Sequence, residues 1–196
     1  MTFPRYWKNI IKMKELSLHI LDLVQNSISA GADMIEILID ENTSKDILVI
    51  SVKDNGKGID KKLIEKVKDP FYTSRTERRV GLGISLLSAA SERCGGCLNI
   101  ESEIGKGTKV TASFIDSHID RAPIGNMWDT IAEIIACNND IDIVYKQKYN
   151  ESEFCLDTRE IKRILKGVPI DSPEVYKWLV NFLKSGIKNL YGGVDD

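Results

Sequence analysis

The sequence predicts an α/β fold, a two-layer α/β sandwich in which helices cover one face of an antiparallel or mixed sheet. The first observation behind it is an apolar stripe with helical spacing over residues 14–30, followed by β-branched runs at residues 34–40 and 46–54. The second is a glycine-led helical segment at residues 81–94, which two short strands follow, at residues 97–102 and 108–114. An order of helix, two strands, helix, two strands favours a sheet with its helices on a single face.

The first helix is clearly marked in the sequence. Its apolar face carries five aliphatic side chains, Leu16, Ile20, Leu23, Val24 and Ile28. Gly31 supplies a stop. Asp22 and Asn26 are four residues apart and therefore share one face of this helix. A carboxylate and an amide on one helical stripe are either solvated or part of a site.

A second region of regular structure follows a polar, proline-containing connection. It is predicted to contain a helix, a strand pair at about residues 141–149 and 153–157, a short helix and a final helix. The inward side chains of its first helix are expected to be Met127, Trp128, Ile131 and Ile135. The chain is thus divided into an N-terminal extension at residues 1–13, a main domain at 14–115, a linker at 116–125 and a small C-terminal α/β region at 126–196.

Two helix caps are predicted in the C-terminal region. Asp157 or Thr158 caps the short helix, and Ser172 caps the final helix, with Pro173 at its first position. The final helix is expected to carry its apolar side chains on one side: Val175, Leu179, Phe182 and Leu190. Trp178 and Phe182 are assigned to core or domain packing, with a partner surface as the alternative.

The composition excludes several classes of function. The chain has 196 residues, of which 42% are hydrophobic and 29% charged, as is usual for globular proteins. A formal net charge of −2 gives no electrostatic case for nucleic acid as a partner. No apolar run approaches the roughly 20 residues that span a bilayer, so no membrane association is expected. The cytoplasm is the expected location.

The cysteines leave two interpretations open. Cys94 and Cys97 have the CxxC spacing of a redox pair or of half a zinc site. The chain has no second CxxC motif, and its histidines are limited to His19 and His118. The favoured interpretation is that Gly95-Gly96 ends a helix and starts a strand, with the two thiols as small apolar neighbours.

Two glycine motifs have the chemistry of a ligand site. DNGKGID at residues 54–60 follows a predicted strand, and its Gly56 and Gly58 allow positive φ and close backbone approach to a ligand. The Asp54 carboxylate can accept a hydrogen bond from an amino group of a base. GLG at residues 81–83 begins a helix, where free N–H groups and the helix dipole attract phosphate. Each motif alone is a weak signal, because both also occur in ordinary turns.

Four segments, in this order, resemble the ATP-binding boxes of the GHKL superfamily: gyrase-type topoisomerases, heat-shock chaperones, histidine kinases and MutL mismatch-repair proteins. LVQNSISAGA with Asn26 resembles the N box, DNGKGI the first glycine box, DPFYTSR the F box of histidine kinases, and GLGISLL the second glycine box. The run ERCGGCLNIESEIGKGTKVTASF resembles the end of a histidine kinase ATP domain, with Cys94 where many kinases carry histidine. The resemblance covers about residues 14–115, and four ordered motifs are much more specific than any one of them.

The resemblance implies a Bergerat-type fold that binds ATP with Mg²⁺. Asn26 would be the magnesium ligand, Asp54 the adenine contact and Thr108 a support for Asp54. Glycines of the first box would shape the adenine pocket, and those of the second would cradle phosphate. The nucleotide-binding set that the resemblance implies is Asn26, Asp54, Gly56, Gly58, Ile59, Phe71, Thr73, Ser74, Arg75, Gly81, Leu82, Gly83 and Thr108.

The chain departs from the kinase pattern at two positions. Residues 69–80 would form a lid over the phosphates, where Arg75, Arg78 or Arg79 could offset triphosphate charge; Arg79 stands where kinases usually have glycine. Asp22 stands where kinases often have asparagine and where the hydrolysing members carry a glutamate base. We therefore name Asp22 as the candidate catalytic residue. It would orient water or join the magnesium shell.

Neither histidine is favoured as a phosphoacceptor. His19 shares the face of Asp22 and Asn26 and is interpreted as a supporting or satisfied helix histidine. His118 begins a pattern similar to a kinase phosphoacceptor box, but it lies downstream of the ATP domain in loop-like sequence. Geometry must precede chemistry, so the structural interpretation is preferred for both.

Three functional hypotheses follow from the resemblance. The first is a stand-alone regulatory ATPase or kinase-like protein with a nucleotide-gated lid. The second is a histidine or serine protein kinase that phosphorylates a partner, and the third is a nucleotide-sensing interaction module with little turnover. A nucleotide and a protein partner are expected in all three, while homodimer formation stays open. The acid at Asp22 favours the first, and the kinase-like boxes favour the second.

Overall fold

The computed structural model describes residues 15–61, Ile64 and 82–193. The N-terminal extension, most of the helix expected after Asp60, and the expected lid at residues 69–80 lie outside the described residues. In the described ranges, no helix is long and apolar enough to cross a membrane.

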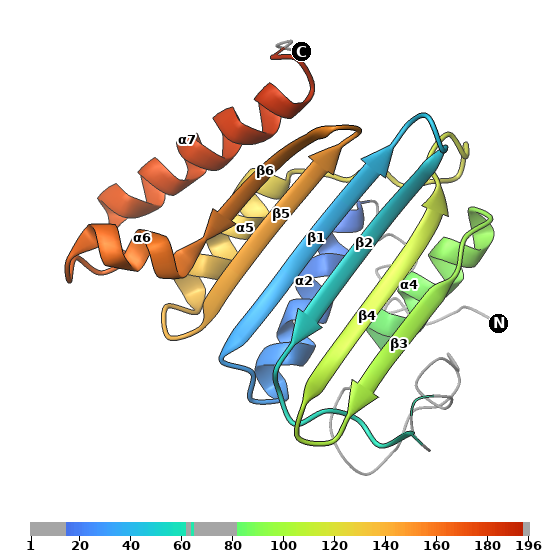
Figure 1. Ribbon diagram of the computed structural model, residues 1–196, viewed down its shortest axis with the longest axis horizontal. Coiled ribbons are helices and arrows are strands. Elements are labelled where there is room, and N and C mark those ends of the chain that lie inside the picture. The colour runs from blue at the N-terminus through green and yellow to red at the C-terminus, as the bar shows by residue number, and fades with distance from the viewer. Residues whose placement is uncertain (1–14, 62–63, 65–81, 194–196) are drawn as a thin grey trace, which may run out of the picture.

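A six-stranded mixed sheet forms one layer, with strand order β3-β4-β2-β1-β5-β6 (Figure 1). Neighbouring strands are antiparallel, except that β1 and β5 are parallel. The strands are β1 (Met34–Asn42), β2 (Ile47–Asp54), β3 (Leu98–Glu103), β4 (Gly107–Ile115), β5 (Asp142–Tyr149) and β6 (Ser152–Asp157). The expected α/β sandwich with a mixed sheet is confirmed.

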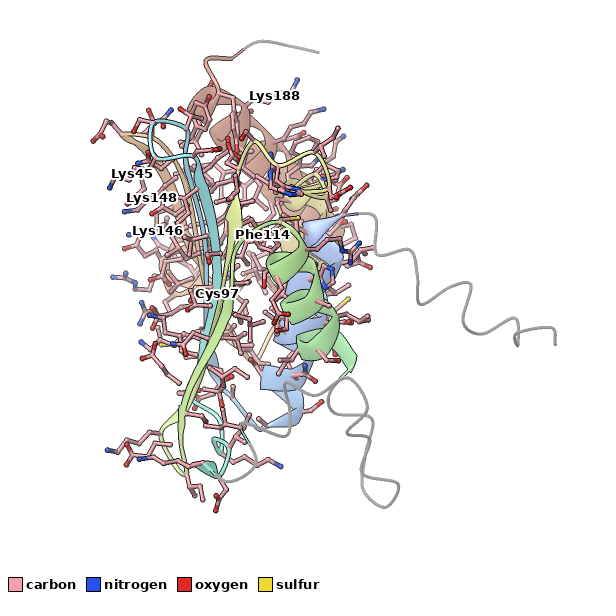
Figure 2. All side chains as sticks on the ribbon, turned by 90° about the vertical axis from the view of Figure 1, so that its right-hand side faces the viewer. Lys45, Cys97, Phe114, Lys146, Lys148 and Lys188 are labelled. Atoms are coloured by element: carbon pink, nitrogen blue, oxygen red, sulfur yellow. The ribbon has the colours of Figure 1, made fainter. Side chains whose placement is uncertain are left out.

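Helices form the second layer, on one face of the sheet. Three of them, α2 (Leu16–Ser29), α4 (Leu82–Arg93) and α5 (Met127–Cys137), lie on the same face, whereas α6 (Thr158–Leu165) and α7 (Pro173–Leu190) lie towards the β6 edge (Figure 1). The opposite face carries polar side chains such as Lys146 and Lys148, with no helix over it in the described part of the chain (Figure 2).

The alternation of the strands determines which face packs. In β1, Ile35, Ile37 and Ile39 are at most 1% exposed, while the residues between them are half-buried. A strand turns successive side chains to opposite faces, so these three point together towards the helices. They meet Leu16, Ile20 and Val24 of α2 in one hydrophobic core.

The C-terminal region extends the same sheet. Strand β5 pairs with β1 over eight residues, from Met34 opposite Asp142 to Glu41 opposite Tyr149. Its inward side chains Ile143 and Tyr145 are fully buried and belong to the same core cluster as those of β1. Helix α5 packs against both α2 and α7. The helix that carries Asp22 and Asn26 is therefore in contact with the C-terminal region.

Several local expectations differ from the structure. Phe182 is 41% exposed, so its placement on the inward side of α7 was wrong; Leu183 and Ile187 continue the buried stripe instead. Trp178 is also exposed and stacks on Phe182 with centroids 5.2 Å apart. Ser172 stands at the N-cap of α7, but its side chain makes no cap hydrogen bond.

The remaining local expectations can be assigned to particular residues. Asp157 caps α6, because its side chain accepts the N–H of Arg159. Gly95 has a φ of +70° and ends α4 as expected. Cys94 is buried there, but Cys97 is exposed, so only one of the two thiols is an apolar neighbour. Both are free thiols.

Candidate nucleotide site

Asp54 lies at the end of β2, where three donors hold its carboxylate. The Ser27 hydroxyl of α2 donates to Oδ2 at 2.7 Å, and the N–H groups of Gly56 and Thr108 donate to Oδ1 at 2.9 and 3.2 Å. The pairing of β2 with β4 places Thr108 directly opposite Asp54. A carboxylate has about four lone-pair sites. The bonds among the described residues therefore leave about one site for the amino group of a ligand.

The two glycines of the motif after β2 lie in close contact with neighbouring residues. A Cβ at Gly56 would lie 3.0 Å from both Cβ and the carbonyl oxygen of Ala30, at the end of α2. Gly58 has a φ of +71°, and a Cβ there would collide with the carbonyl group of Glu103. The N–H of Lys57 also donates to the Ala30 carbonyl at 3.0 Å. These contacts fix the motif against α2 and the β3–β4 turn.

Ser102 connects the motif to the next hairpin. Its hydroxyl accepts the N–H of Ile59 at 2.8 Å and lies 2.9 Å from the Gly107 carbonyl and 2.8 Å from Thr108 Oγ1. Sequence reasoning identified neither Ser102 nor Ser27 as part of the site. Ser27 directly follows Asn26, which could have marked it, but Ser102 lies in an ordinary strand sequence.

A hollow of about 590 Å³ opens beside Asp54, within the size range of small-molecule sites. Its lining includes Asp54, Ser102 and Thr108 from the strand ends, together with Ile64 from the segment after the glycine motif. Charged side chains at the hollow are Lys53, Lys61, Lys106, Lys109, Glu101 and Glu103. The hollow thus borders Asp54 from the side of the β3–β4 hairpin, and no described residue of α2 or α4 lines it.

The start of α4 lies directly against Asp22 of α2. A Cβ at Gly83 would lie 3.0 Å from both Cβ and Oδ2 of Asp22, so glycine permits this approach. Asp22 is half-buried, and burial raises the pKa of its carboxyl group above the usual value. A raised pKa makes a carboxylate a better proton acceptor near neutral pH. The glycine of the second box and the candidate catalytic acid are therefore neighbours.

Asn26 and His19 complete the polar stripe of α2. Asn26 is half-buried and lies one turn beyond Asp22. His19 is only 4% exposed, and no described residue hydrogen-bonds its buried Nδ1. Burial lowers the pKa of His19 to about 4, so the imidazole is neutral at physiological pH. The histidine expected to be satisfied is thus buried, and one of its nitrogens has no hydrogen-bond partner among the described residues.

Five of the predicted nucleotide-binding residues cannot be placed. Phe71, Thr73, Ser74, Arg75 and Gly81 lie outside the described residues. Leu82 is the first residue of α4, but its side chain is not among those described. The described structure brings together the others, from α2, the β2 end, the β4 start and the α4 start.

The oxygen atoms on α2 are suited to magnesium. Mg²⁺ prefers oxygen ligands and usually keeps waters and substrate phosphates in its shell, so one or two protein oxygens suffice. The Asn26 amide oxygen and, on the same stripe, the Asp22 carboxylate can supply them. Among the described residues, no group of three or more His, Cys, Asp or Glu side chains gathers as an all-protein metal site.

The first half of the chain is similar in sequence to parts of known sensor proteins. Sensor protein SrrB of Staphylococcus aureus (strain NCTC 8325 / PS 47) is 34% identical over 110 residues, which are 53% of this chain and 18% of that protein. A protein of Shewanella frigidimarina (strain NCIMB 400) is 32% identical over 103 residues, 52% of this chain and 16% of that one. The chain therefore matches less than a fifth of the length of these relatives.

A solved structure of the N-terminal domain of a DNA repair protein has a similar fold. Its TM-score is 0.53 at 18% sequence identity, and the match covers 91% of this chain and 57% of that chain. The family described as "Histidine kinase-, DNA gyrase B-, and HSP90-like ATPase" matches residues 12–118, which is more than half of the chain. The glycine motifs, the Asp54 cluster and the polar stripe of α2 all lie within this range. The chain therefore belongs to the family of histidine kinase-, DNA gyrase B- and HSP90-like ATPases.

Proposed function

We propose that the protein binds ATP with Mg²⁺ in the space bounded by α2, the glycine motif after β2 and the start of α4, and that it hydrolyses the nucleotide. The observation that carries this proposal is the Asp54 cluster. A carboxylate that is 9% exposed and held by three donors is fixed in orientation, and it keeps an acceptor site for a base amino group.

Each end of the site has a separate binding role. In this proposal Asp54 accepts the adenine amino group, and the glycine backbone of residues 56–58 borders the base. Asn26 binds the metal ion through its amide oxygen, and the N-terminus of α4 at Gly83 faces the phosphates. Magnesium supplies charge neutralisation of the phosphate oxygens. Asp22 adjoins Gly83 and lies one turn from Asn26 on the same helix, which supports its proposed role as the base.

Hydrolysis needs a proton acceptor for the attacking water. In the proposed step, a water oxygen forms a bond to the γ-phosphorus while the bond from that phosphorus to the β–γ bridging oxygen breaks. The water proton passes to the Asp22 carboxylate, and ADP leaves with the bridging oxygen. The raised pKa of Asp22 favours this transfer.

A second candidate function is transfer of the γ-phosphate to a protein partner. The observation that favours it is the identity with a sensor protein over just over half of the chain. In that case a side chain of the partner replaces water as the nucleophile, and Asp22 accepts the proton of that nucleophile.

The experiment incubates the protein with γ-labelled ATP and Mg²⁺ and separates free phosphate from labelled protein. We expect free phosphate from the wild type and a loss of at least about tenfold in Asp22→Asn, because general-base groups contribute about 10² to 10⁴ in rate. Asn26→Ala is expected to lose Mg-ATP binding, and Gln25→Ala, its exposed neighbour on the same helix, serves as the matched control.

Two outcomes would contradict the proposal. Unchanged affinity for Mg-ATP in both Asn26→Ala and Asp54→Ala would remove the site assignment. Unchanged release of phosphate in Asp22→Asn would remove the base. Phosphate retained on a protein, rather than released, would favour the second candidate.

A further inference from the structure

Helix α2 is held at both of its ends by other parts of the chain. At its C-terminal end, Ser27 donates to Asp54 at 2.7 Å and the Ala30 carbonyl accepts the N–H of Lys57 at 3.0 Å. At its N-terminal end, the N–H groups of Leu16 and Ser17 donate to the carbonyls of Pro123 and Ile124, at 2.9 and 2.8 Å. The first end is anchored by the nucleotide site and the second by the segment that leads to the C-terminal region.

The second anchor replaces the usual side-chain cap. The first N–H groups of a helix have no partner within the helix and normally bond to the side chain of the N-cap residue. Glu15 is the N-cap of α2, and its side chain makes no such bond. The carbonyls of Pro123 and Ile124, more than 100 residues further along the chain, satisfy two of these donors. We call residues 123–125 the clasp.

Gly125 allows the clasp to reach the helix. It has a φ of +87°, and a Cβ there would lie 2.6 Å from Ser17 Oγ, 2.8 Å from Glu15 Cβ and closer still to Glu15 Oε2. The next residue, Asn126, caps α5 by accepting the N–H of Asp129 at 3.1 Å. Clasp and α5 are thus directly continuous, and α5 packs on α2 and on α7.

We propose that the clasp is a positioning element of the nucleotide site and that it acts mainly on Asp22. This inference rests on the proposed function. Asp22 lies five residues beyond Ser17, whereas Asn26 is next to Ser27, which is tied to Asp54. Loosening the first turn of a helix disturbs the residues nearest to it most. The clasp therefore controls the acid, while the opposite anchor holds the metal and adenine contacts.

The proposal gives the C-terminal region a role in the reaction. A change in α5 or α7 reaches the clasp through the continuous backbone at Gly125 and Asn126. It then alters turnover with little effect on nucleotide affinity. A ligand or partner of the C-terminal region would regulate hydrolysis in this way without touching the nucleotide.

The test compares Gly125→Ala with Gly167→Ala in the full chain. Gly167 has a φ of +97° but no atom within 4 Å of an added Cβ, so it repeats the backbone strain without the collision. We expect Gly125→Ala to lower the ATP turnover number about tenfold, which corresponds to about 1.4 kcal/mol in the activation barrier, and to change the ATP Kd less than about threefold. Gly167→Ala should leave both values unchanged.

A milder variant and a double variant sharpen the result. Pro123→Gly places flexibility at an exposed residue of the clasp and should lower turnover roughly two- to fivefold with the fold intact. In an Asp22→Asn background, Gly125→Ala should change the remaining turnover less than about twofold, because its effect passes through Asp22.

Three results would overturn the inference. Equal losses in affinity and turnover, a full additional loss in the Asp22→Asn background, or unfolding of Pro123→Gly would make the clasp a structural support alone. Failure of the proposed function is distinguishable, because the wild type itself would then fail either to bind ATP or to release phosphate from it.

Discussion

Replacing Ser27 by alanine tests the junction between α2 and the end of β2. The Ser27 hydroxyl lies 2.7 Å from Asp54 Oδ2 and 3.2 Å from the Leu23 carbonyl. It has a single proton, and the shorter contact to a charged oxygen is the better hydrogen bond. The residue is 3% exposed, so water cannot easily take the place of the hydroxyl.

The magnitude follows from this contact. A hydrogen bond to a charged group is worth about 1.5–3 kcal/mol, and alanine regains roughly 0.5 kcal/mol of helix propensity. We therefore expect Ser27→Ala to lower the free energy of unfolding by about 1–2.5 kcal/mol. The same substitution should weaken ATP binding by about tenfold, because Asp54 loses one of the bonds that fix its carboxylate.

Urea unfolding followed by circular dichroism measures the first effect, and isothermal titration calorimetry with ATP measures the second. Ser29→Ala is the matched control, since Ser29 is an exposed serine at the end of the same helix. A destabilisation of Ser27→Ala no larger than that of Ser29→Ala would refute the assigned bond. Unchanged ATP affinity in a destabilised Ser27→Ala would refute its link to the site.

Three further predictions concern the glycine motif, the buried histidine and the C-terminal strands. Gly58→Ala should destabilise the fold by at least about 1–2 kcal/mol more than Gly105→Ala in thermal unfolding, because both have positive φ but only Gly58 faces a collision, with the Glu103 carbonyl; equal values would contradict it. Burial lowers the pKa of His19 to about 4 in the folded state, from an ordinary 6.5. Between pH 6.5 and 4 the unfolded state therefore binds the proton more readily than the folded state. The free energy of unfolding falls over this range by about 3 kcal/mol in total. His19→Leu should abolish this part of the pH dependence, and a wild-type stability that is flat between pH 6.5 and 4 would argue against it. Because β5 pairs with β1 over eight residues and shares its core, the C-terminal region should unfold together with the rest of the sheet. In a Trp7→Phe variant the remaining tryptophans are Trp128 and Trp178, and their fluorescence should follow the same unfolding curve as circular dichroism. Two separate midpoints would show that the C-terminal region unfolds alone.

Local sequence patterns were sufficient to place the elements. The alternation in residues 34–40 and the 3.6-residue stripe of residues 14–30 are properties of adjacent residues, so each predicted its own strand or helix. The same local reasoning failed at Phe182, because Phe182 and Leu183 are both compatible with a helical stripe that begins at Val175 and Leu179. Only packing against α5 and β6 decides which of the two neighbours is buried.

The site depends on contacts that no local pattern encodes. The order of the motifs indicated Asp54, Asn26 and Asp22 as site residues, because each lies in a recognisable segment. The roles of Ser27 and Ser102 are defined by the tertiary structure, which brings α2, β2 and the β3–β4 hairpin together around Asp54. A hydroxyl has the same sequence signature whether it is solvated or bonded, so its role depends on the partner that folding brings to it.

The sequence by itself determined the two-layer α/β class, the order of the elements and the family resemblance, because periodicity and glycine spacing are carried by neighbouring residues. Only the tertiary structure decided that β5 joins β1 in parallel and that Pro123 and Ile124 cap α2. These pairings join segments about 100 residues apart through backbone N–H and C=O groups. Every residue has these groups, apart from the N–H that proline lacks, so they carry no sequence signature. The packing of the whole core decides which segments pair. That packing also places the clasp against α2, the helix that carries Asp22.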